Sequence, residues 1–190
     1  MSPRRREQGK CPHGPEARIR FIIGCVANII LALGANLGDP EQAFRRALNS
    51  LADDHELVAT SRLYRTRPVG PPQPEFLNMA AILDVACPLV GFLDRCLRLE
   101  VEAGRERENE VRWGPRVLDL DLCLARGVIH RGPLLVLPHP RLHERSFVLA
   151  PAAEIAPGWI HPLIGRTLED LAREAERREP GGILGVERFI

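Results

Sequence analysis

The chain has 190 residues, enough for one domain with a proper hydrophobic core. Lys and Arg number 26 against 25 Asp and Glu, and the resulting net charge of +1 gives no support for general binding to nucleic acid or to a membrane surface. No segment approaches the roughly 20 apolar residues of a membrane span. The five cysteines are odd in number and form no CxxC pair, which indicates reduced thiols in a cytoplasmic protein.

Residues 1–25 are expected to form a disordered extension ahead of a single domain at 26–190. The first 20 residues are polar and basic, and a lipoprotein signal is disfavoured. Arg18 and Arg20 leave only four residues before Cys25, too few for the apolar part of such a signal.

The first elements of the domain are a strand and a helix. The aliphatic run 26–33 predicts a buried strand. Asp39 is placed to cap a helix whose first residue is Pro40, with Gln42 at the capping-box position. Apolar residues then recur at 3–4 spacing to about residue 52: Phe44, Ala47, Leu48 and Leu51.

Two strands, at 55–66 and 76–85, follow on either side of a proline-rich loop, and Pro88 opens a second helix. Extending the apolar stripe of that helix places Glu100 on or near its inward face. A lone glutamate there is more often structural than functional.

The second half begins with the charged segment 104–112, for which we expect a mobile surface loop. Strands are predicted at 117–124 and 134–137, and a last helix starts at Thr167. No internal repeat or linker divides the chain.

Two aspartates interrupt the leucine-rich strand at 117–124. Because side chains alternate along a strand, Asp119 and Asp121 project together with Val117 and Cys123, and the four leucines face the other way: Leu118, Leu120, Leu122 and Leu124. Such a carboxylate pair suits Mg²⁺ that also binds substrate phosphates. The alternative is a strand with one solvent-exposed face, on which the two acids have no special role.

Arginines near this pair favour a metal–polyphosphate site, since guanidinium groups bind phosphate in a bidentate manner: Arg105, Arg107, Arg112, Arg116, Arg141 and Arg145. No GxxxxGK[ST] motif is present, so a nucleotide would be bound by another scheme. His139 and His143 lack partners at zinc spacing and fit capping or phosphate hydrogen bonds better.

Four segments, in order, resemble the 6-hydroxymethyl-7,8-dihydropterin pyrophosphokinase family: LGANLGD, SRLYRTRPVG with QPEFLNMA, RWGPRVLDLDL, and PHPRLHERSFVLAPAAEIAP. The resemblance covers residues 27–172. It implies an α+β, ferredoxin-like sandwich, a central antiparallel-rich sheet with helices on both faces. The implied reaction is Mg²⁺-dependent transfer of pyrophosphate from ATP to the pterin alcohol, giving AMP and a pterin diphosphate in tetrahydrofolate biosynthesis.

The resemblance also assigns residues. Asp119 and Asp121 would hold two Mg²⁺ ions, and catalytic arginines would be Arg105, Arg107 and Arg116. The pterin would be bound by Thr66, Val69, Phe76, Asn78, Trp113 and Phe147. ATP would be bound by Glu100, Leu122, His139 and Arg145. The partners would be these small molecules alone, with the protein a monomer.

Five positions depart from the family pattern: Arg67, Phe76, Cys123, Leu134 and Val136. Two other functions remain open. A Mg²⁺-dependent phosphodiesterase or nuclease could use the same aspartates, and a non-catalytic pterin- or nucleotide-binding protein could retain the site.

Overall fold

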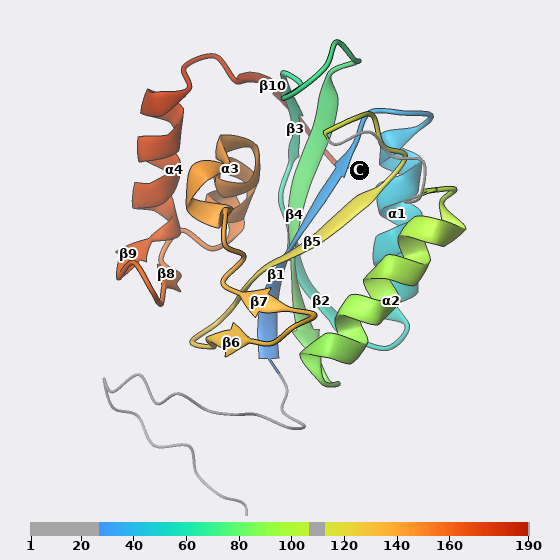
Figure 1. Ribbon diagram of the computed structural model, residues 1–190, viewed down its shortest axis with the longest axis vertical. Helices are drawn as coiled ribbons and strands as arrows, with labels where there is room; N and C mark the ends of the chain where they lie inside the picture. The colour runs from blue at the N-terminus through green and yellow to red at the C-terminus, as the bar shows by residue number, and fades with distance from the viewer. Residues whose placement is uncertain (1–26, 107–112, 190) are drawn as a thin grey trace, which may run out of the picture.

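The computed structural model describes residues 27–106 and 113–189. A six-stranded sheet separates two pairs of helices (Figure 1). Helices α1 (Pro40–Ala52) and α2 (Leu89–Glu102) cover one face, and α3 (Ser146–Ile155) and α4 (Leu168–Arg178) cover the other. No helix in the described ranges has the length and apolar character needed to cross a bilayer.

Strand β1 (Ala27–Ala35) lies between β4 (Phe76–Val85) and the edge strand β5 (Asp119–Ala125). The far edge of β4 pairs with β2 (Glu56–Thr60) and then β3 (Leu63–Thr66), and β10 (Ile183–Glu187) extends the sheet beyond β3. Every pairing is antiparallel. The order β5–β1–β4–β2/β3 is that of a ferredoxin-like sandwich, which confirms the predicted fold class.

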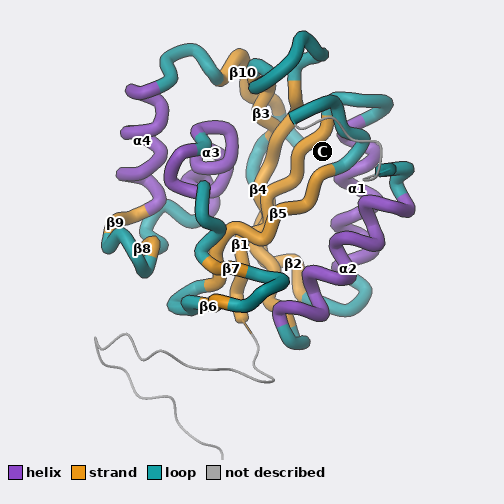
Figure 2. Tube along the Cα trace, in the orientation of Figure 1, coloured by secondary structure: helices purple, strands orange, loops and turns teal. Residues whose placement is uncertain are grey.

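Short elements connect the main ones (Figure 2). One hairpin consists of β6 (His130–Arg131) and β7 (Val136–Leu137), and a second of β8 (Ile160–His161) and β9 (Arg166–Thr167). A 3₁₀ turn, η2 (Leu142–Glu144), leads directly into α3.

The start of α1 forms as its sequence predicts. The side chain of Asp39 accepts a hydrogen bond from the Gln42 N–H at 3.0 Å, and Pro40 is the first helical residue. The apolar residues at 3–4 spacing are all buried, because the helix packs them against the sheet.

The predicted secondary structure needs correction at three places. The expected strand 55–66 is interrupted at residues 61–62, where the Ser61 hydroxyl accepts a hydrogen bond from the Ala80 N–H at 2.9 Å. Side-chain alternation in β5 ends early, because a bulge shifts the β1–β5 register, and Leu124 therefore packs with Cys123 under α3 and α4. Helix α3 was not predicted, since it is apolar on most sides and contains Pro151.

A polar contact fastens α3 to the interruption between β2 and β3. Glu154 of α3 accepts hydrogen bonds from the Arg62 Nε at 2.9 Å and from the Tyr64 hydroxyl at 2.7 Å. Burial, and then the bond to Glu154, raise the pKa of Tyr64 to about 12. The phenol is therefore held in its neutral, donating form.

Tyr64→Phe tests this contact. We expect a loss of about 1 kcal/mol in the free energy of unfolding at neutral pH, the usual net value of one hydrogen bond. A raised pKa gives the folded state an extra stability that is complete below the ordinary value of 10.0 and is lost as pH rises through about 12. The variant should therefore lose less stability over that range, as measured by urea unfolding.

Tyr64 is the only tyrosine in the chain, so tyrosinate absorbance reports it alone. An absorbance midpoint at the ordinary pKa of a free phenol would contradict the assigned contact.

Candidate active site

A cavity of about 230 Å³ opens at one end of the sheet, where β1 and β3 end and β4 and β5 begin. Antiparallel pairing brings these four strand ends together. The lining residues come from these ends, from the loops beside them and from the helical layer: Gly34, Thr66, Arg67, Val69, Phe76, Asn78, Trp113, Arg116, Asp119, Arg141, Glu144, Arg145, Phe147 and Glu179.

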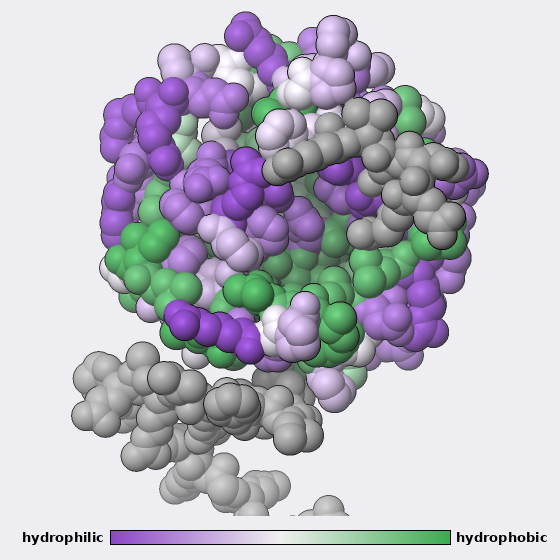
Figure 3. Space-filling model, in the orientation of Figure 1, coloured by the Kyte–Doolittle hydropathy of each residue, from purple (hydrophilic) through white to green (hydrophobic). Residues whose placement is uncertain are grey.

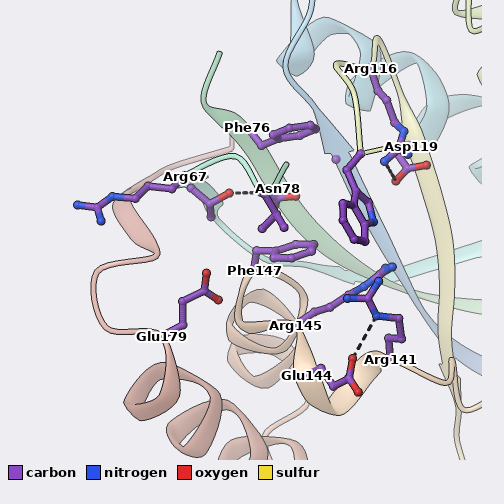
Figure 4. A pocket seen from close by; sticks show the side chains of 14 residues that line it. Arg67, Phe76, Asn78, Arg116, Asp119, Arg141, Glu144, Arg145, Phe147 and Glu179 are labelled. Carbon is purple, nitrogen blue, oxygen red and sulfur yellow. Dashed lines mark hydrogen bonds and ion pairs between the residues drawn. The ribbon is translucent and has the colours of Figure 1, made fainter. Parts of the chain in front are cut away.

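The middle of the cavity is a slot between two phenyl rings (Figure 4). Phe76 at the start of β4 and Phe147 in α3 face each other across it, with Asn78 between them on the sheet. The Asn78 amide donates to the Thr66 hydroxyl at 2.8 Å, and both residues are buried. This arrangement suits a flat ring that stacks between the phenyl groups and is read by polar groups at its edge.

The floor of the slot is a row of three residues on adjacent strands. Gly34 is the register partner of Asn78 on one side and of Asp119 on the other. A Cβ atom at Gly34 would stand 3.0 Å from the Asn78 Oδ1. The glycine therefore leaves open the space between the amide and the carboxylate.

Both aspartates of β5 pair with arginines from other segments. Asp119 accepts from Arg105 and, at 3.3 Å, from Arg116, and Asp121 accepts from Arg145 at 2.8 Å. The two carboxylates retain 26% and 34% side-chain exposure, enough for a ligand to reach them. Paired carboxylates ringed by arginines can hold a metal–phosphate group.

Glu100 lies beneath this group, fully buried in α2. Its Oε1 atom accepts hydrogen bonds from the Leu120 N–H and from the Arg105 Nη1, both at 2.8 Å. The prediction of an inward-facing glutamate is confirmed. In the structure it positions Arg105 and the backbone of β5 and does not line the cavity.

A hydrogen-bond network not found by sequence reasoning joins three loops at the cavity mouth. The buried Asn36 amide donates to the Gln73 side chain at 3.1 Å, and Gln73 donates to the Trp113 carbonyl at 2.6 Å. The Asn36 Oδ1 also accepts from the Arg116 N–H at 2.7 Å. Only the asparagine in GANLG and the glutamine in PPQPE signal this network in the sequence.

Trp113 has a positive φ of 61° and packs against Gly70, where an added Cβ atom would lie 2.9 Å from the Trp113 Cβ. Gly70 itself has a φ of 114°, in the region that favours glycine. The loop after β3 is thus shaped to receive the tryptophan.

Comparison with known proteins identifies the family. A model described as 7,8-dihydro-6-hydroxymethylpterin-pyrophosphokinase (HPPK) matches residues 30–157. The chain belongs to this family. It is therefore an enzyme of the pyrophosphokinase class, as the four motifs predicted.

Relatives named 2-amino-4-hydroxy-6-hydroxymethyldihydropteridine pyrophosphokinase resemble most of the chain. The one from Bacillus subtilis is 43% identical over 169 residues, covering 84% of this chain and 94% of the relative. The one from Methylorubrum extorquens is 41% identical over 161 residues, covering 83% and 97%.

Among solved structures, the HPPK-DHPS protein of Plasmodium falciparum has a TM-score of 0.62 at 12% identity, covering 82% of this chain. The chain spans 45% of that longer protein. At this identity the likeness concerns the fold alone.

Most residues assigned from the HPPK resemblance meet at the cavity. Nine line it: Thr66, Val69, Phe76, Asn78, Trp113, Arg116, Asp119, Arg145 and Phe147. Arg105 and Asp121 pair with lining residues. Leu122 is buried in the core beneath α2, and Arg107 lies outside the described residues, as does most of the predicted loop 104–112.

His139 lies near Arg141 and Arg145, on the segment that leads into η2. Its N–H donates to the Cys123 carbonyl at 2.7 Å, and its Nδ1 accepts from the Arg141 N–H at 3.1 Å. Burial lowers the pKa of His139, although Asp121 opposes the shift. A neutral imidazole fits hydrogen bonding better than ion pairing.

Five lining residues are not among those assigned from the resemblance: Gly34, Arg67, Arg141, Glu144 and Glu179. Arg141 and Glu144 pair with each other at 3.1 Å. Glu179 lies beyond the region of the family motifs, so no motif signalled it.

The donor set fits Mg²⁺. In the described parts of the chain, no group of three or more His, Cys, Asp or Glu side chains could hold a metal alone. Two adjacent carboxylates suffice when phosphate and water oxygens supply the remaining ligands, as is usual for Mg²⁺.

Gly34→Ala tests the floor of the slot. The added methyl group should displace the Asn78 side chain. The free energy of pterin binding should become less favourable by about 1–3 kcal/mol, the usual range for overpacking. We expect at least about fivefold weaker binding of 6-hydroxymethyl-7,8-dihydropterin by calorimetry, by the standard conversion of free energy to affinity.

Gly91→Ala is the control, because a Cβ atom at this exposed helical position meets nothing within 4 Å. Unchanged pterin affinity in Gly34→Ala would show that the slot does not need the open floor.

Proposed function

We propose that the protein catalyses the Mg²⁺-dependent transfer of pyrophosphate from ATP to 6-hydroxymethyl-7,8-dihydropterin, in tetrahydrofolate biosynthesis. The products are AMP and the pterin diphosphate. The observation that carries the proposal is the slot between Phe76 and Phe147, which runs from Asn78 on the sheet to Asp119 and the arginines around it.

The slot would bind the pterin. The two phenyl rings stack on its faces, and the Asn78 amide with Thr66 and the backbone near Val69 reads its polar edge. Trp113 covers the mouth and helps to exclude water, which would otherwise compete as the nucleophile. The hydroxymethyl group then points towards Asp119.

The charged end would bind the ATP phosphates. Asp119 and Asp121 would hold two Mg²⁺ ions, which would neutralise negative charge on the phosphates. Arg116 and Arg145 already contact these aspartates, at 3.3 and 2.8 Å, and would contact the phosphates alongside the metal. We propose two further catalytic arginines, Arg105 and Arg107, of which Arg107 lies outside the described residues.

The residues would act chiefly by positioning. The hydroxymethyl oxygen forms a bond to the β-phosphorus and loses its proton to solvent, while the bond from that phosphorus to the α,β-bridging oxygen breaks. AMP leaves with the bridging oxygen. The arginines stabilise the charge that gathers on the transferred oxygens, and the stacked pterin keeps the attacking oxygen in line.

The nucleotide base would lie near β5 and the β6–β7 hairpin. Leu134 and Val136 are 72% and 41% exposed there, and hydrophobic surface gathers over this part of the molecule (Figure 3). With Leu122 behind them, these side chains favour binding adenine mainly by apolar contact. His139 and Glu100 would act on ATP from the phosphate side, Glu100 through Arg105. We also infer a monomer in the cytoplasm.

Two other functions are disfavoured. A hydrolase acting at the same aspartates needs a base or further acids beside the metals, whereas the neighbours here are arginines suited to a bound triphosphate. A non-catalytic binding protein would have no use for an intact set of paired carboxylates and arginines.

Product analysis tests the reaction. With ATP, Mg²⁺ and 6-hydroxymethyl-7,8-dihydropterin, we expect AMP and a pterin diphosphate in equal amounts, separated by chromatography. Release of ADP would exclude pyrophosphoryl transfer, and the absence of AMP would favour a binding protein. Inorganic phosphate or pyrophosphate released without the pterin diphosphate would indicate a hydrolase.

Asp119→Asn combined with Asp121→Asn tests the metal role. We expect AMP formation to fall by about 10²–10⁴, since metal stabilisation of phosphoryl transfer amounts to several kcal/mol. The parent should bind ATP more tightly with Mg²⁺ than without it, and the double variant should lose this difference.

Asp94→Asn, an exposed carboxylate on α2, is the matched control and should match the parent. An intact Mg²⁺ dependence of ATP binding in the double variant would show that the aspartates do not hold the metal.

A further inference from the structure

The two ends of the slot differ in charge. Arg116, Asp119 and the arginines next to η2 gather at one end, and Arg67 and Glu179 lie on the opposite side of the two phenyl rings (Figure 4). The guanidinium group of Arg67 points away from the rings, whereas the carboxylate of Glu179 points towards them. The second end therefore presents a negative charge to whatever fills the slot.

Three hydrogen bonds hold Glu179 and the turn after it in place. It caps α4, and its N–H donates to the Ala175 carbonyl at 3.0 Å. Its Oε2 accepts from the hydroxyl of Ser146, the buried residue next to Phe147, at 3.3 Å. The turn after it is tied to the end of β3, because the Gly182 carbonyl accepts from the Arg67 N–H at 3.0 Å.

The other carboxylates that line the cavity already have cationic partners. Asp119 pairs with Arg105 and Arg116, and Glu144 pairs with Arg141. For Glu179, by contrast, no ion pair is formed within residues 27–106 and 113–189. Its charge is thus available to hydrogen-bond donors of a ligand.

The orientation of the pterin decides which donors these are. The hydroxymethyl carbon and the 2-amino group sit on opposite ends of the bicyclic ring. If the hydroxymethyl group points to Asp119, the pyrimidine end with its 2-amino and ring N–H groups points towards Glu179. A carboxylate accepts from two such parallel donors in a bidentate manner.

We propose that Glu179 is a specificity-determining residue that selects 2-amino pterins by accepting hydrogen bonds from their pyrimidine edge. The same carboxylate disfavours ring systems with a 2-oxo group, because two acceptors then face each other. The proposal rests on the proposed function, whose substrate it places in the slot. Glu179 lies outside the residues matched by the family model, so this selection is a property of the C-terminal segment of this chain.

Calorimetry with two ligands tests the proposal: 6-hydroxymethyl-7,8-dihydropterin and the lumazine that carries oxygen in place of its 2-amino group. For Glu179→Gln, we expect about tenfold weaker binding of the pterin, the usual scale for a hydrogen bond to a charged group. Lumazine affinity should stay constant or rise. In turnover, KM for the pterin should rise while kcat stays within about twofold, because the interaction is equal in ground and transition states.

Glu176→Gln is the control, an exposed acid one turn earlier in α4 that does not line the cavity. An equal loss of affinity for both ligands, or no change in either affinity, would overturn the proposal. Turnover by the parent protein would in that case still support the proposed reaction. If the parent neither binds the pterin nor forms AMP, the proposed function fails and this inference fails with it.

Discussion

The antiparallel register of the sheet is the constraint on which the site depends. It aligns Asn78, Gly34 and Asp119 across three neighbouring strands, so that an amide and a carboxylate share one face with an open glycine between them. A shift of one residue would turn each side chain to the other face. The long pairing of β1 with β4, from Ala27–Val85 to Ala35–Leu77, fixes this register over nine residue pairs.

Buried charge holds the other side of the site in place. Glu100 is fully buried and bonds both to the backbone of β5 and to Arg105, which in turn contacts Asp119. Removing one partner of such a buried pair costs about 3–5 kcal/mol, because the other charge stays buried. Helix α2 is thereby coupled to the carboxylates without touching the cavity. Glu100 thus influences the site through the position of Arg105.

The sequence predicts those features that depend on local periodicity. The α1 cap, the buried stripe of α1 and the shared face of Asp119 and Asp121 follow from spacing alone. Three features do not follow from spacing: the interruption at Ser61, the bulge that places Leu124 on the other face of the sheet, and helix α3. Each is set by contacts with strands that are distant in sequence. The pterin and the pyrophosphate came from the resemblance, since spacing indicates only a metal–phosphate site.

Helix α3 shows why the remaining site residues escape local reasoning. It carries Phe147 and follows Arg145 directly, yet its apolar surface has no helical stripe that could reveal its orientation. Packing in the second core and the contact of Glu154 with Tyr64 and Arg62 fix that orientation instead. The same layer brings the end of α4, with Glu179, against Ser146. Selectivity at the pyrimidine end of the slot would therefore depend on how α3 and α4 pack, whereas the phosphate end depends on β5 and α2. Substitutions in one layer can alter ligand choice while the charged end keeps its geometry.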